Sequence, residues 1–212
     1  MKIVNAGFEI IDPLNGEEIL KKIERVARVC YKSEDKITAG SAEKMVKGLI
    51  KRGHEAMLEH FSFSVMFTVD RGVSHELVRH RIASFAQEST RYCNYGHEGE
   101  ITVIEPYYFK DCREKEPWKY HSWAEACEKA EDRYLALLEY GASPQEARAV
   151  LPNSLKTEIV VTANLREWRN IFKLRAVGVT GKPHPQMVEV MVPLLEEVKK
   201  QIPVVFDDLV TE

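Results

Sequence analysis

The chain has 212 residues, and 44% of them are hydrophobic, which is enough apolar material for an ordinary globular core. Its 30 basic and 33 acidic side chains give a formal net charge of −3, which excludes a general attraction to nucleic acid or to an anionic membrane. We expect neither a transmembrane segment nor a secretion signal, because no uncharged apolar stretch is long enough. The length fits one large domain or two small ones, of which we expect a single domain over residues 1–212, and we expect a cytoplasmic protein with no membrane partner.

Hydrophobic periodicity predicts the elements of the first half of the chain. Apolar residues at helical spacing indicate three helices, over residues 17–31, 41–53 and 73–83. Residues 2–12 alternate loosely and indicate a first strand, and residues 61–69, with an apolar side chain at every second position, form the clearest strand pattern. Residues 84–95 are polar and aperiodic, so we expect an ordered loop there, where chemistry is commonly found.

The second half of the chain also mixes strand and helix signals. Strands are expected over residues 101–104 and 156–163. Helices are expected over residues 118–140, after Ser143-Pro144, over residues 164–175 with Asn164 as the cap, and over residues 185–200. We predict an α/β fold of the α+β type, with a central, mostly antiparallel sheet flanked by long helices.

Cysteine and histidine spacing does not indicate a metal site. The cysteines form no CxxC pair and match no disulfide framework, so we expect reduced thiols at Cys30, Cys93, Cys112 and Cys127. The segment HEAMLEH places His54 and His60 six residues apart, whereas the zinc motif HExxH places its histidines four apart. We therefore predict no bound metal.

The densest unusual feature is the basic stretch RHRIASFAQESTR over residues 79–91. Its simplest interpretation is a solvated basic face, because such runs are common on protein surfaces. On a helix, Arg79, His80 and Arg81 would spread over about 200° and could not hold one small ligand together. The three side chains must therefore serve different groups or face solvent.

Further arginines lie far from this stretch in the sequence. Arg148 precedes LPNS, and Arg166 and Arg175 lie nine residues apart on the helix that Asn164 opens. Nine residues are two and a half helical turns, so one helix presents these two arginines on different faces. Arginine suits bidentate binding of phosphate and of planar polar edges. Convergence on one ligand is easier if helices of neighbouring subunits meet at a shared site, which favours an oligomer.

The basic stretch resembles a family motif at the right spacing. Arg79-His80-Arg81, seven residues, and then Ser89-Thr90-Arg91 is similar to the RHR-x7-S-x-R motif of the flavin-dependent thymidylate synthases. The resemblance extends to RGHEAMLEH with His54, to EARAVLP with Arg148 and to TANLREWRNIFKLRA with Asn164 through Arg175, so it covers nearly the whole chain.

This resemblance implies an activity and its cofactors. The family methylates dUMP to dTMP, with 5,10-methylenetetrahydrofolate as the carbon donor and NADPH as the reductant of bound FAD. The chain is therefore expected to be an FAD-dependent methyltransferase of nucleotide biosynthesis. The resemblance also implies a homotetramer whose active sites are shared between subunits.

Individual roles follow from the resemblance, position by position. Arg175 matches the arginine that activates the uracil ring, where a fixed guanidinium against N3 and O4 would stabilise developing negative charge. The expected FAD contacts are His54, Arg79, His80, Arg81, Gln87, Asn164, Arg166, Asn170 and His184. The expected dUMP contacts are Glu76, Arg79, Gln87, Glu88, Ser89, Thr90, Arg91, Arg148 and Arg175.

Some details depart from the family pattern. Glu76 stands where relatives commonly have Gln, and Gln87 stands where many have Glu. Since a glutamate would repel a nearby phosphate, Glu76 is expected to face the uracil or the ribose if it contacts the nucleotide. The stretch before His184 is longer than in some relatives, so this residue is either a flavin contact or a histidine at a helix start.

Two other kinds of function compete with this interpretation. Arg79–Arg91 with the aromatics Phe85, Tyr92 and Tyr95 has the composition of a nucleic-acid-binding patch, but the net charge of −3 argues against it, so we expect no nucleic acid partner. A flavoprotein without catalytic activity, or an oligomerisation scaffold, also fits the motif. A visible flavin spectrum of the purified protein would separate the flavoproteins from the nucleic-acid binder.

Overall fold

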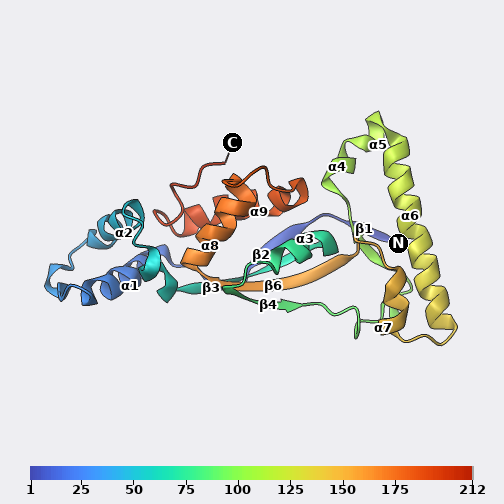
Figure 1. The fold of residues 1–212 in the computed structure, drawn as a ribbon, viewed down its shortest axis with the longest axis horizontal. Helices are drawn as coiled ribbons and strands as arrows, with labels where there is room; N and C mark the ends of the chain where they lie inside the picture. Colours follow the sequence, from blue (N-terminus) through green and yellow to red (C-terminus); the bar gives the residue numbers. More distant parts are fainter. Residues whose placement is uncertain (212) are drawn as a thin grey trace. The chain divides into compact units, whose positions relative to one another are not determined.

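The computed structural model describes residues 1–211 and arranges their strands in two sheets (Figure 1). The larger sheet is antiparallel and has the strand order β2-β3-β6-β4. Its strands are β2 (Gly7–Ile10), β3 (Ser62–Asp70), β6 (Lys156–Asn164) and β4 (Ala83–Gln87). In the smaller sheet, β1 (Lys2–Val4) pairs in parallel with β5 (Thr102–Ile104). The predicted α/β fold with a mostly antiparallel sheet is confirmed.

The chain packs into two compact units. Unit 1 consists of Met1–Phe8, Met66–Arg79 and Phe85–Val160, and unit 2 of Glu9–Val65, His80–Ser84 and Val161–Glu212. Each strand of the antiparallel sheet has residues in both units. The prediction of one domain over the whole chain stays a prediction.

Unit 1 has a core between the parallel strand pair and the long helix α6 (Pro117–Glu139). Its buried members are Ile101, Val103, Cys127, Tyr134, Ala147 and Leu155. The shorter helices of this unit are α3 (Arg71–Leu77), α4 (Tyr107–Lys110), α5 (Cys112–Lys115) and α7 (Pro144–Ala147), with 3₁₀ turns η3 (Tyr95–His97) and η4 (Arg148–Val150). The predicted helices over 118–140 and after Ser143-Pro144 are confirmed.

Unit 2 is mainly helical. Helices α1 (Gly16–Val29) and α2 (Ser41–Lys51) lie side by side (Figure 1), and η1 (Glu34–Lys36) lies between them in the sequence. The unit also contains the 3₁₀ helix η2 (Glu55–His60), α8 (Leu165–Phe172), the π-helix η5 (Lys173–Val177) and α9 (Pro185–Gln201). The predicted amphipathic helices α1 and α2 and the predicted last helix are confirmed within one or two residues at most ends.

Aromatic packing holds α8 in unit 2. The fully buried Trp168 stacks on Phe63 at 4.9 Å and on Phe172 at 5.7 Å between ring centroids. Its indole Nε1 donates a hydrogen bond to the backbone oxygen of Phe63 at 3.1 Å. The buried Phe206 meets Phe172 edge-on at 5.5 Å. This packing fixes α8, the helix that carries Asn164 at its start and Arg166 in its first turn.

Three sequence-based predictions are wrong in detail. Residues 2–12 form two strands in different sheets, not one strand. The helix expected over 73–83 ends at Leu77, and part of the expected loop 84–95 is strand β4. The residues of β4 alternate between half-buried and exposed, but Ala83, Ser84 and Gln87 are too weakly apolar or polar to show that period in the sequence.

The helix expected from Asn164 to Arg175 changes its geometry before it ends. Asn164 caps α8 as predicted, since its side chain accepts the backbone N–H of Glu167 at 2.9 Å. From Lys173 the turn widens to a π-helix, and Gly178, with φ of 81°, ends it. The backbone N–H of Gly178 bonds to the oxygen of Lys173 at 2.9 Å. Hydrophobic periodicity cannot reveal a single π turn, because it adds only one residue to the period.

Candidate functional site

The residues expected at the site divide between the two units. Most expected dUMP contacts belong to unit 1, namely Glu76, Arg79, Gln87, Glu88, Ser89, Thr90, Arg91 and Arg148. Unit 2 contains Arg175 and most expected flavin contacts, namely His54, His80, Arg81, Asn164, Arg166, Asn170 and His184. Each unit therefore holds one chemically coherent part of the expected site.

The RHR segment lies in the turn after α3 and not on a helix. Asp70 caps α3, because its Oδ1 accepts the backbone N–H of Val73 at 2.7 Å. Arg79 and Arg81 are exposed, whereas His80 is only 5% exposed. The turn therefore sends the three side chains into different environments, with Arg79 and Arg81 facing solvent, and their service to different groups stays a prediction.

The side-chain amide of Gln87, at the end of β4, is held by hydrogen bonds from its nitrogen. Its Nε2 donates to Ser74 Oγ at 2.9 Å and to Thr157 Oγ1 at 3.2 Å. Both amide hydrogens are thereby used, so Gln87 can offer a ligand only its Oε1 acceptor. This neutral amide stands where the resemblance leads one to expect a glutamate, and Glu76, which lies on α3, is half-buried.

The Glu88 carboxylate is fully engaged inside unit 1. Its Oε1 accepts the Tyr95 hydroxyl at 2.7 Å, and its Oε2 accepts Lys156 Nζ at 3.2 Å and the backbone N–H of Glu158 at 3.3 Å. Burial and the hydrogen bond to Glu88 raise the pKa of Tyr95 well above its usual range, so the phenol stays protonated. Burial lowers the pKa of Lys156, but the contacts with Glu158 and Glu88 outweigh it and raise that pKa overall. This network holds the residue before the segment Ser89-Thr90-Arg91 in place.

The segment Ser89-Thr90-Arg91 forms a tight turn. The backbone oxygen of Ser89 accepts hydrogen bonds from the backbone N–H groups of Tyr92 and Cys93. The side-chain Oγ of Ser89 accepts one from the backbone N–H of Arg91 at 3.3 Å. Arg91 is exposed, and its Nε donates to Gln145 Oε1 at 3.0 Å. An exposed arginine held by a neutral amide keeps its full positive charge for an anionic ligand.

A cationic pocket of about 280 Å³ lies beside this turn, within unit 1. Its polar lining consists of Arg71, His75, Thr90, Arg148 and Asn153, and no carboxylate lines it. Arg148 Nη1 donates to the buried Thr90 hydroxyl at 3.3 Å. Arg71 Nη1 donates to the backbone carbonyl oxygen of Glu88 at 3.4 Å and to Thr157 Oγ1 at 3.3 Å. Within residues 1–211 neither arginine forms a salt bridge, so the pocket carries uncompensated positive charge.

In unit 2 the structure brings His80 and Arg175 together. Arg175 Nε donates to His80 Nε2 at 3.1 Å, and His80 Nδ1 lies 3.3 Å from Glu167 Oε1. Asn170 Nδ2 donates to the same carboxylate at 3.2 Å. Arg175, His80, Glu167 and Asn170 therefore form one hydrogen-bonded row, although His80 and Arg175 are 95 positions apart in the sequence.

The expected flavin contacts of α8 line a pocket of about 430 Å³ in unit 2. Asn164, Arg166, Asn170 and the exposed Ile82 lie on its wall, and Glu59 Oε1 pairs with Arg166 Nη1 at 2.5 Å. Glu55, Glu59 and Glu167 also line this pocket, so its amides and its exposed apolar side chain fit a planar polar ring better than a phosphate. The donor set is therefore compatible with part of FAD.

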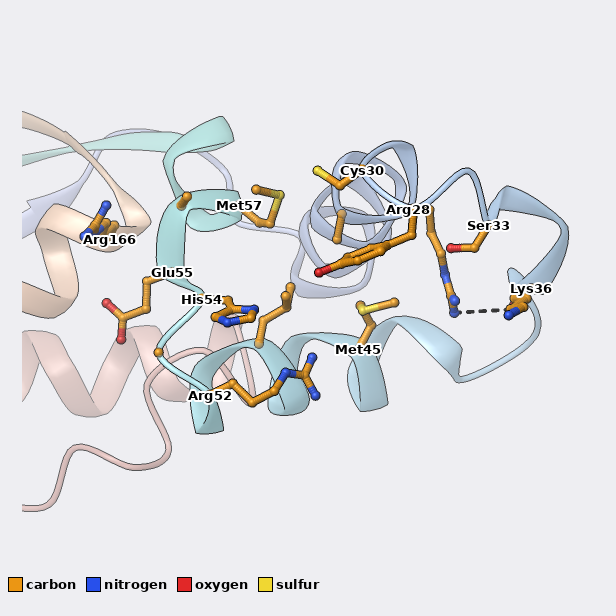
Figure 2. Close-up of a pocket in the computed structure, with 15 residues that line it drawn as sticks. Arg28, Cys30, Ser33, Lys36, Met45, Arg52, His54, Glu55, Met57 and Arg166 are labelled. Atoms are coloured by element: carbon orange, nitrogen blue, oxygen red, sulfur yellow. Dashed lines mark hydrogen bonds between the residues drawn. The ribbon is translucent and has the colours of Figure 1, made fainter.

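A larger pocket of about 860 Å³ lies between α1, α2 and η2, also in unit 2. Figure 2 shows His54 and Met45 directed into it, whereas Glu55 points away. Its rim carries Arg52 and Lys36, and neither forms a salt bridge within the described part of the chain. The pocket thus combines an apolar wall with cations and adjoins His54 and Arg166, two expected flavin contacts.

His184 is the N-cap residue of α9 and is exposed, which matches the alternative of a histidine at a helix start. Its role toward flavin stays a prediction.

The four cysteines are free thiols, as expected. Within residues 1–211 no helix is both long and apolar enough to span a membrane.

Sequence reasoning missed Arg71, His75 and Glu167. Arg71 and His75 stand on successive turns of α3, close in sequence to Arg79, so a basic face on this short helix was the available signal. Glu167 carried a weaker signal, because a glutamate three residues after an N-cap asparagine usually belongs to the helix cap. Only its burial, at 6% exposure, and its partners reveal a different use.

The fold and these pockets define an α/β protein with an antiparallel sheet and an arginine-lined pocket whose chemistry suits an anionic ligand. The family model of the thymidylate synthase complementing protein matches residues 11–204. The flavin-dependent thymidylate synthase of Geobacter sulfurreducens is 34% identical over 189 residues, which cover 86% of this chain and 78% of that protein. The one from Corynebacterium efficiens is 35% identical over 212 residues, which cover 93% of this chain and 82% of that protein.

A solved structure supports the fold independently. The crystal structure of the UMP/dUMP methylase PolB from Streptomyces cacaoi, bound with 5-Br dUMP, matches with a TM-score of 0.83 and 23% identity. The match covers 98% of this chain and 96% of that chain. The chain therefore belongs to the family of the flavin-dependent thymidylate synthases.

Proposed function

We propose that this protein methylates dUMP to dTMP as a flavin-dependent thymidylate synthase, with 5,10-methylenetetrahydrofolate as the carbon donor and NADPH as the reductant of bound FAD. The observation that carries the proposal is the cationic pocket of unit 1, which no carboxylate lines. Because the chain belongs to this family, a nucleotide phosphate is the anion that we expect there. We further propose a homotetramer that acts in the cytoplasm, with active sites shared between subunits.

The 5′-phosphate of dUMP is proposed to bind in this pocket. Thr90 and Arg148 are the expected nucleotide contacts that line it, and Arg71 adds a second guanidinium already oriented by two oxygen atoms. A phosphate monoester accepts several charge-assisted hydrogen bonds, each stronger than a neutral one. Ser89 and Arg91 belong to the same turn as Thr90 and would also contact the nucleotide. Gln87 would offer its Oε1 to a ribose hydroxyl or to the uracil imide.

FAD is proposed to bind against unit 2, where its contacts would be His54, His80, Asn164, Arg166 and Asn170, with Arg79, Arg81, Gln87 and His184 as the remaining expected contacts. When bound, FAD would supply the hydride chemistry that protein side chains lack. The chain's part would be to fix the ring and exclude water. The pocket of about 430 Å³ is smaller than a whole flavin dinucleotide requires, which supports a site completed by a neighbouring subunit.

The 860 Å³ pocket beside His54 is proposed to receive the co-substrates. Methylenetetrahydrofolate carries a planar ring and carboxylates, and NADPH carries planar rings and phosphates. The apolar wall would pack against the rings, and Lys36 and Arg52 at the rim would attract the anionic groups. The two molecules share this chemistry, so binding of one would exclude the other.

Arg175 is proposed to activate the uracil ring. Methylation at C5 needs electron density at that carbon, which builds up when negative charge is accepted at N3 and O4. A guanidinium held against that edge in a dry pocket stabilises the charge by about 3–4 kcal/mol, as other fixed donors do for oxyanions. No covalent enzyme nucleophile is then required.

The test is turnover with single omissions. Purified protein should show a flavin spectrum and should form dTMP only when dUMP, methylenetetrahydrofolate, FAD and NADPH are all present. Turnover after complete removal of flavin would contradict the proposal. A protein without flavin, without turnover and with tight binding to RNA or DNA would instead support a nucleic-acid-binding module.

A further inference from the structure

Glu167 is a buried carboxylate that the family motif does not explain. It is 6% exposed and stands at the third position of α8, where a glutamate commonly returns to the N-cap backbone. Here its side chain instead meets His80 Nδ1 at 3.3 Å and Asn170 Nδ2 at 3.2 Å. Within residues 1–211 it has no lysine or arginine partner, so the imidazole and the amide together compensate its burial.

The contact between Arg175 and His80 determines where the imidazole proton lies. Arginine has only donors, so the Nε–H of Arg175 can bond to His80 Nε2 at 3.1 Å only if that nitrogen carries no proton. The ring proton must then be on Nδ1, which faces the Glu167 carboxylate, a pure acceptor when ionised. Donor and acceptor roles thus alternate consistently from Arg175 through His80 to Glu167.

We propose that Glu167 is a positioning residue for Arg175 and acts through the His80 imidazole. Its carboxylate stabilises the Nδ1–H tautomer, and this tautomer offers Nε2 as the acceptor that orients the guanidinium. Because Nε–H of Arg175 is used by His80, the uracil edge must be met by the terminal Nη groups. The catalytic part of this inference rests on the proposed function; the tautomer part does not.

The wrong tautomer would disturb this row directly. With the proton on Nε2, two donors would face each other across 3.1 Å, and Arg175 would lose the contact that fixes its plane. In Glu167→Gln the side chain keeps its shape, but its amide can present either an acceptor or a donor to Nδ1. The variant should therefore populate both tautomers and leave Arg175 less well oriented.

The first measurement is the tautomer of His80 by nitrogen-15 NMR on protein labelled at histidine. The chain has seven histidines, so the His80 signals are assigned from their loss in His80→Asn. We expect a proton on Nδ1 in the wild type and a mixture of tautomers in Glu167→Gln. A wild-type proton on Nε2, or the same tautomer in both proteins, would overturn the proposal. This readout needs neither flavin nor turnover, so it stands even if the proposed function fails.

The second measurement is single-turnover formation of dTMP. We expect Glu167→Gln to slow this step about 10–100-fold, as loss of a carboxylate that orients a functional histidine does elsewhere, while dUMP affinity changes less than about threefold. Glu196→Gln, which removes an exposed carboxylate of α9 in the same unit, should leave the rate unchanged.

A double-mutant comparison separates positioning from a general structural effect. In an Arg175→Ala background, Glu167→Gln should cause no further loss of rate, because the group that it orients is absent. An additional loss of similar size in that background would show that Glu167 acts on something else, such as flavin binding, and would refute the proposal. If Glu167→Gln does not fold, the same rate and tautomer measurements are made on Glu167→Asp. A wild-type His80 proton on Nε2 would refute the proposal without any variant.

Discussion

Arg175 and Arg91 are expected to act at different stages of the reaction. Arg175 would meet charge that develops on the uracil, whereas Arg91 would meet a phosphate that is charged from the start. Arg175→Ala should therefore slow single-turnover methylation much more than it weakens dUMP binding. Arg91→Ala should mainly weaken dUMP binding, by about 1.5–3 kcal/mol, as expected for a charge-assisted hydrogen bond.

Separate measurements of dUMP affinity and of single-turnover rate test this difference. Flavin reduction by NADPH without dUMP should change little in either variant and serves as the control. A nearly normal single-turnover rate in Arg175→Ala would mean that another residue activates the ring. The exposed Arg91 side chain contacts Gln145 and, at 5.3 Å, the ring of the exposed Tyr92, so its replacement should not disturb folding.

Arg169 is expected to be a stability residue, although it lies on the same helix as Arg166. It is 1% exposed, and it donates to both oxygens of Asp208 at 2.7 Å, to Glu55 Oε1 at 3.2 Å and to the oxygen of Val205. Arg169→Met should lower the free energy of unfolding by about 3–5 kcal/mol, toward the lower end because Asp208 is half exposed and rehydrates. Urea unfolding at one fixed protein concentration measures this.

The same ion pair predicts a pH dependence. Hydrogen bonds from Arg169 hold the pKa of Asp208 below its ordinary value of 3.8. The pair therefore stabilises the fold fully above about pH 4, and this contribution is lost as the pH falls through the lower pKa of the folded state. Between about pH 4 and pH 2 the wild type should lose more stability than Asp208→Asn. If the unfolding free energies of the wild type and of Asp208→Asn fall identically over this pH range, the ion pair does not contribute to stability there.

At the scale of elements, the start of α1 depends on a close approach to the end of α9. A Cβ on Gly16 would meet the backbone oxygen of Gln201 and come within 3.0 Å of Pro203 Cδ. Gly16→Ala should thus cost about 1–3 kcal/mol of unfolding free energy, as overpacking usually does. The matched control is Gly7→Ala, because nothing lies within 4 Å of a Cβ there. Equal stability of both variants, measured by thermal unfolding, would contradict a tight contact between these helices.

At the scale of the whole molecule, the active unit is expected to be a tetramer. Arg79, Arg81, Arg91, Arg148 and Arg166 are all exposed in the single chain. A bound nucleotide is usually buried over most of its surface, so other subunits must cover these arginines. Sedimentation at assay concentration should give about four times the chain mass of 24.4 kDa. Full activity from a verified monomer would refute this.

Elements with a strong local signal were predictable from the sequence. The alternation over residues 61–69 identified β3, and the amphipathic spacing over 17–31 identified α1, because each pattern reports directly which face is buried. Strand β4 escaped prediction because it is short, lies at the edge of the sheet and alternates only weakly apolar residues. The π turn around Arg175 escaped because hydrogen bonds, not hydrophobicity, define it.

The sequence by itself determined the family, the expected ligands and most expected site residues, because the spacing of RHR and S-x-R is a local property of the chain. Only the tertiary structure decided which of these side chains meet. It placed His80 between Arg175 and Glu167, engaged the Glu88 carboxylate within unit 1 and added Arg71 to the pocket of Arg148. The physical reason is that hydrogen bonds and burial join residues far apart in the sequence, such as His80 and Arg175 at 95 positions and Glu55 and Arg169 at 114, and no local pattern records such contacts.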